Sequence, residues 1–203
     1  TVTLYTCWQD QGQGADAGAL VHTYEALRPL GLRPDQIKLV MNDTGLAPIH
    51  GPAAGSRSHY MAGNAILNAA EQLMNAMRKE DGTFRTYDEL VADGIATKYT
   101  GIFDNTGMTT DLDPNTGQGD PTAEYTFGAF LAEVEVDITT GKTKVLSMKC
   151  VADVGVIGNI VSVDGQAYGG MMHGIGMALS ENYEDLKKHT TLAGSGFTFI
   201  DMV

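Results

Sequence analysis

Glycine clusters beside apolar helical patterns constrain this chain more than any other feature of its sequence. The chain has 25 glycines among 203 residues, about 12% where typical proteins have about 7%. They form no repeat and no linker, and they gather in three groups, each beside a predicted helix: Gly12, Gly14 and Gly18; Gly51 and Gly55; Gly165, Gly169, Gly170, Gly174 and Gly176. Glycine lets a backbone approach another group closely, or lets amides point into one concavity. The sequence therefore predicts three places where the backbone lies close to a ligand or a neighbouring helix.

Apolar periodicity predicts strands at Val2–Trp8, 37–41 and 98–103, and helices after the first strand, at about 56–79 and at 87–93. The longest helix has one apolar face: Ala62, Ile66, Ala69, Ala70, Leu73 and Met77. Residues 104–121 read as an exposed loop. A hairpin is predicted at 127–136 and 143–152, followed by a glycine-rich helix at 164–182 with Asp164 as N-cap, and by a last apolar, strand-like run.

These patterns predict an α+β fold with a mixed sheet and packed helices, as part of one cofactor-binding domain. We expect two halves, residues 1–103 with two glycine-rich loops and residues 121–203 with the hairpin and the glycine-rich helix. The net charge of −12, without a basic cluster, argues against nucleic acid as a partner. No apolar run is long enough to cross a membrane and no signal peptide is recognisable, so we expect a cytoplasmic location. Cys7 and Cys150 alone exclude a disulfide framework or a four-cysteine cluster within the chain.

The first candidate site is the loop between the first strand and its helix, which carries Gln11, Gly12, Gln13 and Gly14. A helix start offers unpaired amides and partial positive charge to an anion. The second is the start of the long helix at Gly55, Ser56, Arg57 and Ser58, where small residues, hydroxyls and one Arg suit a diphosphate. A ligand-free turn explains the first equally well, and an ordinary serine N-cap with a solvated Arg57 explains the second.

The third candidate is the glycine-rich helix itself, with Gln166 and His173 as its polar side chains. Each interior glycine costs about 1 kcal/mol relative to alanine. Close packing against a cofactor or another helix would offset that cost, and helix packing alone is the simpler explanation.

Four segments in this order resemble the molybdenum hydroxylase family, which includes aldehyde oxidoreductases and xanthine dehydrogenases. They are GQGAD, GPAAGSRSHYMAGNAI, FGAFLAEVEVDITTGKTKV and DGQAYGGMMHGIGMALSE. The resemblance covers nearly the whole chain and lies in the second molybdopterin-binding region of the large subunit. It is strongest toward bacterial aldehyde oxidoreductases that carry molybdopterin cytosine dinucleotide, notably at ENYEDLKKHTTLAGSGF.

The resemblance implies roles for single residues. Gln11, Gly12 and Gln13 match the family's cofactor loop, where the Gln lies near the oxo ligand of molybdenum. The segment from Gly55 to Ser58 matches the helix start that holds the phosphate-bearing end of the cofactor. His173 stands where the family usually has Gln, and Gln166 is the neighbouring polar candidate. No residue of the chain is expected to ligate the metal directly.

The family's catalytic Glu lies downstream of the segment that matches 197–203, so the resemblance implies that this chain is a fragment without its catalytic residue. We expect the fragment alone to be inactive. The parent would hydroxylate an aldehyde with water as the oxygen source, contain 2Fe-2S clusters outside this chain and form a homodimer. The remainder of the parent polypeptide and a small aldehyde are the expected partners.

Three other interpretations stay open. A xanthine or purine dehydrogenase would share the same cofactor segments. A Rossmann-like nucleotide-binding module fits the strand, Gly12-x-Gly14 and helix, although Asp43 follows Gly12 by 31 residues where about 20 are expected. A non-catalytic segment whose glycines only pack would need no ligand.

Overall fold

The computed structural model describes residues 1–181, and it divides into two compact units, Thr1–Tyr125 and Thr126–Val203. The predicted end of the last helix at Asn182, the apolar run after it and most of the ENYEDLKKHTTLAGSGF segment lie outside the described residues. The α+β class is confirmed. The parallel and antiparallel strand pairs form two separate two-stranded sheets within the described part, rather than one mixed sheet.

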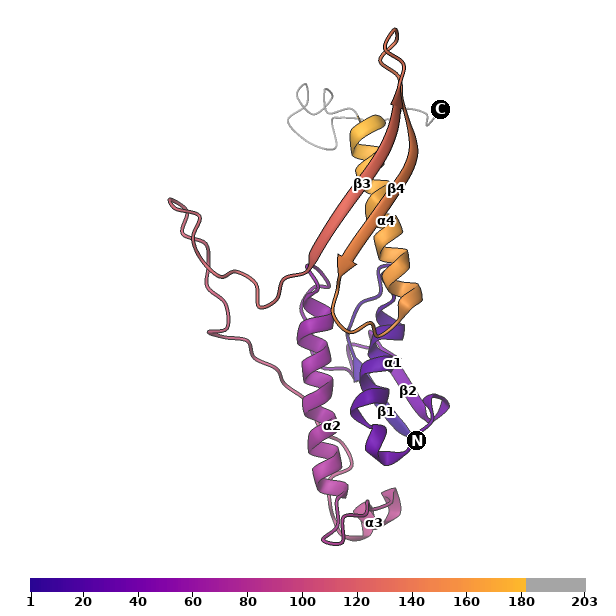
Figure 1. Cartoon of the computed structure of the whole chain (residues 1–203). Coiled ribbons are helices and arrows are strands. Elements are labelled where there is room, and N and C mark those ends of the chain that lie inside the picture. The colour runs from indigo at the N-terminus through magenta and orange to yellow at the C-terminus, as the bar shows by residue number, and fades with distance from the viewer. Residues whose placement is uncertain (182–203) are drawn as a thin grey trace. The chain divides into compact units, whose positions relative to one another are not determined.

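The first unit packs two helices on a parallel strand pair. Strands β1 (Val2–Thr6) and β2 (Ile37–Met41) pair in parallel, with Val2 opposite Ile37. Helices α1 (Ala15–Ala26) and α2 (Gly63–Met77) run beside them, and a short helix α3 (Tyr87–Ala92) follows (Figure 1). The predicted helix 87–93 is confirmed, and Thr86 caps it by accepting from the Glu89 amide.

The core of this unit lies where the helices meet the strands. Its buried members are Trp8, Ala15, Ala19, Ala62 and Ile66, with Leu4, Leu39 and Met41 packed against them. The apolar face predicted for the long helix is confirmed, since Ala62, Ile66 and Ala70 are buried. Gly18 leaves room for the indole of Trp8, because a Cβ there would lie 3.2 Å from the ring.

The strand predicted at 98–103 is wrong, since no strand forms there. Gly101 lies directly on α2, where a Cβ would fall 1.8 Å from the carbonyl oxygen of Ala65. The amide of Ile102 donates to Asn68 Oδ1 at 3.2 Å, and Gln72 Nε2 donates to the carbonyl of Thr100 at 3.2 Å. The backbone of this segment is thus bound by side chains of α2 instead of a neighbouring strand.

The second unit contains a long hairpin and one helix. Strands β3 (Phe127–Val136) and β4 (Thr143–Asp153) pair antiparallel with an irregularity at Glu133/Val134, which confirms the predicted hairpin. Every residue of β3 is exposed, so its predicted apolar face has no cover among the described residues.

Helix α4 (Ile160–Leu179) begins earlier than predicted. Asn159 is its N-cap, with Oδ1 accepting from the Ser162 amide at 3.1 Å, so the assignment of Asp164 as the cap is wrong. Asn159 and Asp164 are both suitable N-cap residues. Asn159 is the cap because the helix already begins at Ile160. A Cβ at Gly165, Gly169, Gly170 or Gly174 would meet no atom within 4 Å, so the expected close packing at these glycines does not occur within the described residues. No helix of residues 1–181 is both long and apolar enough to span a bilayer.

Candidate cofactor-binding site

The first glycine-rich loop connects β1 to α1 and is closed by its own side chains. Gly12 and Gly14 adopt left-handed φ values of 103° and 87°, which glycine tolerates best. Gln13 Nε2 donates to the carbonyl of Gln9 at 2.8 Å, and Gln13 Oε1 accepts from the Gln11 amide at 2.6 Å. Both polar ends of the Gln13 side chain therefore hold the shape of the loop.

The carboxylate of Asp10 occupies the start of α1. It accepts from the amides of Gly12 at 2.8 Å, Gly14 at 3.4 Å and Asp16 at 3.3 Å. These bonds, first from Gly12 and then from Asp16, lower the pKa of Asp10 because they favour the charged carboxylate. The amides that sequence reasoning assigned to an external anion thus already face an internal one. An Asp just before a glycine-rich helix start is the signal that would have revealed this.

The second glycine-rich loop leads into the long helix through two left-handed residues, Gly55 at φ 55° and Ser56 at φ 59°. The helix opens as a π-helical turn, Ser58–Ala62, which continues as α2. No side chain caps this start, so the simple N-cap explanation for Ser56 or Ser58 is wrong. The Arg57 guanidinium lies on Gly51, where a Cβ would fall 2.8 Å from Cζ.

Three buried polar atoms around this helix start have no hydrogen-bond partner among residues 1–181: His50 Nε2, Arg57 Nη1 and Ser58 Oγ. Ser58 is only 6% exposed. Arg57 also forms no ion pair within residues 1–181. A buried donor without a partner costs about 1–3 kcal/mol, and more when it is charged. Arg57 Nη1 and Ser58 Oγ can donate, so the arrangement suits a ligand with anionic acceptors. Sequence reasoning missed His50, because its Nδ1 bond of 2.7 Å to the Gly51 carbonyl is visible only in the fold.

The two loops meet at the carboxyl ends of the parallel strands. Gln9 Oε1 accepts from the Ala53 amide at 3.1 Å, a contact across 44 residues of sequence. A cavity of about 230 Å³ lies beside this contact, lined by Cys7, Gln9, Asn42, Thr44, Ala47, Ile49 and His50. Ligands of open α/β sheets bind at this end of the strands. The fold thus brings both predicted loops together at the carboxyl ends of the strands.

A histidine pair ties α1 to the start of the long helix. His22 Nε2 lies 3.2 Å from His59 Nδ1, and both rings pack near Trp8. Burial, and then repulsion from His59, lowers the pKa of His22. One ring must donate and the other accept, so the contact requires that at least one imidazole is neutral.

This pair predicts a loss of stability in acid. Because the folded-state pKa of His22 lies below its ordinary value of 6.5, the unfolded chain binds the proton more tightly. The free energy of unfolding then falls as the pH drops from about 6.5 through the folded-state pKa. We expect the thermal midpoint of the protein to fall less between pH 7.5 and pH 5.5 in His22→Gln than in the wild type. Equal acid sensitivity in His22→Gln and the wild type would contradict the role of the pair.

Gln166 and His173 both lie on α4, in the second unit, and both are exposed. Their spacing of seven residues places them on the same side of the helix. Among residues 1–181, no group of three or more His, Cys, Asp or Glu side chains is arranged to hold a metal ion.

Comparison with known proteins identifies the family of the chain. Residues 1–198 match the family described as molybdopterin cofactor-binding domain. The chain is 48% identical over 203 residues to the aldehyde oxidoreductase of Megalodesulfovibrio gigas, covering all of this chain and 22% of that protein. It is 30% identical to the xanthine dehydrogenase of Oryza sativa, over 83% of this chain and 13% of that enzyme.

Solved structures give the same result. The aldehyde oxidoreductase of Desulfovibrio desulfuricans superposes with a TM-score of 0.85 at 52% identity, over 97% of this chain and 21% of that one. The chain thus spans about one fifth of the length of the bacterial relatives it matches. The family match over nearly all its residues and the unpartnered polar atoms at the helix start lead to one conclusion: the chain belongs to the molybdopterin cofactor-binding domain family.

Proposed function

We propose that this chain is part of the cofactor-binding region of a molybdenum-dependent aldehyde oxidoreductase, a longer enzyme that oxidises aldehydes to carboxylic acids with water as the oxygen source. The observation that carries the proposal is the buried Nη1 of Arg57, which, like the buried hydroxyl of the next residue, Ser58, has no hydrogen-bond partner among residues 1–181. In a chain of net charge −12, an arginine with a buried, unpartnered Nη1 and no carboxylate partner among residues 1–181 is best explained by an anionic ligand.

The residues at the helix start fit the phosphate-bearing end of molybdopterin cytosine dinucleotide. Arg57 and Ser58 would donate to phosphate oxygens. A Cβ at Gly55 would meet no atom within 4 Å, so the backbone there is open to a close approach. When bound, the cofactor supplies the redox chemistry, and this chain binds and orients it.

The first loop has a different proposed role. Because Asp10 and Gln13 hold its amides and its shape, residues 11–14 would position the cofactor through the loop backbone rather than bind its phosphates. The hydrogen bond from the Ala53 amide to Gln9 would fix this loop relative to the phosphate end. Gln166 and His173 remain proposed pterin-side contacts from α4.

The same proposal extends to the rest of the longer enzyme. Its catalytic Glu and 2Fe-2S clusters would lie outside this chain, so the isolated chain would be inactive, and the parent would be a cytoplasmic homodimer without nucleic-acid or membrane partners. A purine dehydrogenase is the second candidate, and the 30% identity to the rice enzyme supports it less than the 48% identity to the bacterial one. A Rossmann-like module is disfavoured because the carboxylate of Asp10 already occupies the amides that would bind a diphosphate.

Substitution of Gly55 tests the proposal. We expect Gly55→Val in the full-length protein to reduce both molybdenum and released cytosine nucleotide per protomer by at least about tenfold, because a branched side chain would fill the approach to the helix start. Metal analysis and chromatography of the released nucleotide measure the two quantities.

A matched control separates ligand exclusion from backbone strain. Gly82 has a similar left-handed φ of 84° and equally open surroundings, but it lies in the turn after α2. Gly82→Val should therefore retain normal cofactor content. Normal molybdenum in Gly55→Val, or an equal loss in both variants, would show that this helix start does not hold the cofactor.

A further inference from the structure

One edge of strand β1 has no partner in the described part of the chain. β1 pairs only with β2, and the amide of Asn42 donates to the carbonyl of Thr6 at 2.9 Å. Since the N–H and C=O of one strand residue point to the same side and alternate along the strand, Val2, Leu4 and Thr6 face β2. Thr3 and Tyr5 therefore direct their backbone groups to the opposite, free edge. Thr3 and Tyr5 are half-buried, and backbone groups that are removed from water are almost always paired in native proteins.

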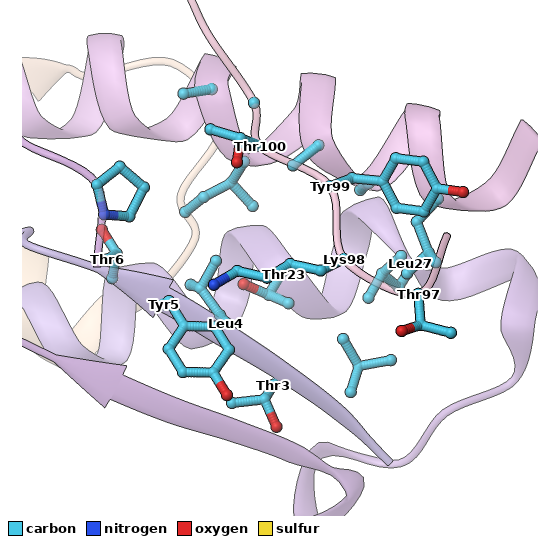
Figure 2. A pocket seen from close by; sticks show the side chains of 18 of the residues that line it. Thr3, Leu4, Tyr5, Thr6, Thr23, Leu27, Thr97, Lys98, Tyr99 and Thr100 are labelled. Atoms are coloured by element: carbon cyan, nitrogen blue, oxygen red, sulfur yellow. The ribbon is translucent and has the colours of Figure 1, made fainter. Parts of the chain in front are cut away.

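A cavity of about 1040 Å³ lies beside β1 (Figure 2). All residues of the strand line it, together with apolar side chains that include Leu27, which follows α1, and Ile66 and Leu73 of α2. Its volume is at the upper end of the roughly 300–1,000 Å³ of small-molecule pockets. The cavity thus has apolar walls and lies against a strand whose free edge carries the backbone groups of Thr3 and Tyr5, and an extended segment satisfies such groups better than a small molecule.

The segment 97–101 forms another wall of this cavity. It is held to α2 by the close contact of Gly101 and by the bond from Gln72 to Thr100, so it does not pair with β1. Lys98 Nζ reaches across to lie 4.9 Å from the centre of the Tyr5 ring. Residues that read as a strand in sequence therefore form no strand, although they line the same cavity as β1.

We propose that an extended segment of the same long polypeptide, outside residues 1–203, pairs with the free edge of β1 and places its apolar side chains in this cavity. The inference rests on the proposed function in one respect, that the chain is part of a longer enzyme. The matched bacterial relatives are about five times as long as this chain, so they contain ample sequence for such a strand. A segment of the same polypeptide also has a far higher effective concentration than a second copy.

Hydrogen exchange of the full-length protein tests the pairing residue by residue. We expect the amides of Thr3 and Tyr5 to exchange roughly 100-fold or more slowly than in an unstructured chain, and thus to resemble Leu4, whose amide faces β2. Fast exchange at Thr3 and Tyr5 with a protected Leu4 would overturn the proposal. So would protection that disappears on dilution, because a second copy would then be the partner. Molybdenum content, measured on the same sample, shows separately whether the cofactor proposal holds.

A proline substitution provides a second readout. Tyr5→Pro removes an N–H that faces the free edge, and β2 does not use it. Tyr5→Ala loses the same side chain but keeps the N–H, so it is the matched control. We expect Tyr5→Pro to lower the thermal midpoint of the full-length protein further than Tyr5→Ala. Equal midpoints for the two variants would mean that no strand pairs at this edge.

Discussion

Gly101→Ala is expected to destabilise the protein by about 3 kcal/mol, because the new methyl group would overlap backbone atoms of α2. The Cβ would lie 1.8 Å from the carbonyl oxygen of Ala65 and 2.7 Å from the amide nitrogen of Ala69. Backbone atoms inside a helix cannot move aside as the end of a flexible side chain can. The segment 97–101 must then lift from the helix and lose the hydrogen bonds of Thr100 and Ile102 to Gln72 and Asn68.

Urea unfolding of the full-length protein measures this effect, and Gly128→Ala is the control. A Cβ at Gly128 would meet its nearest atom at 3.5 Å, an ordinary contact distance, so that variant should retain a midpoint close to the wild type. A wild-type midpoint in Gly101→Ala would contradict the described contact between this segment and α2.

Local sequence patterns predicted the elements whose signals lie within one stretch of the chain. The long helix was predictable because Ala62, Ile66 and Ala70 recur at helical spacing and are buried. The hairpin was predictable from its alternation and its turn. The start of α4 was not, because Asn159 and Asp164 are both acceptable caps and only the bond from the Ser162 amide decides between them. The segment 98–103 was misread because pairing depends on a neighbour that local sequence does not contain.

The candidate site was also predictable only where it depends on local sequence. A helix start with small residues and one Arg predicted the region of Gly55–Ser58, where the structure places two unpartnered polar atoms. Asp10 and His50 escaped prediction, because their importance depends on which amides and side chains the fold brings to them. Gln13 was predicted to face a ligand. In the structure, its Oε1 and Nε2 instead form hydrogen bonds within the loop.

Arg57→Met is expected to weaken cofactor binding roughly ten- to a hundredfold while leaving the cofactor-free protein as stable as the wild type or more stable. Loss of a charge-assisted hydrogen bond to phosphate removes about 1.5–3 kcal/mol of binding free energy. Without a ligand, the buried Nη1 of this half-buried side chain has no hydrogen-bond partner among residues 1–181. Replacing it with an apolar side chain of similar length therefore removes a desolvation penalty. Molybdenum per protomer and the thermal midpoint of the cofactor-free protein measure the two effects.

The opposite directions of these two effects make the test of Arg57 specific. A purely structural arginine would lower the midpoint of the cofactor-free protein when replaced, and cofactor content would fall only as far as folding does. Arg28→Met is the control for net charge, since Arg28 is exposed and forms only a surface pair with Glu25 at 3.5 Å. Such pairs contribute little to stability, so this variant should match the wild type in both measurements. Full molybdenum content in Arg57→Met would contradict the assignment of this helix start to the phosphate-bearing end of the cofactor.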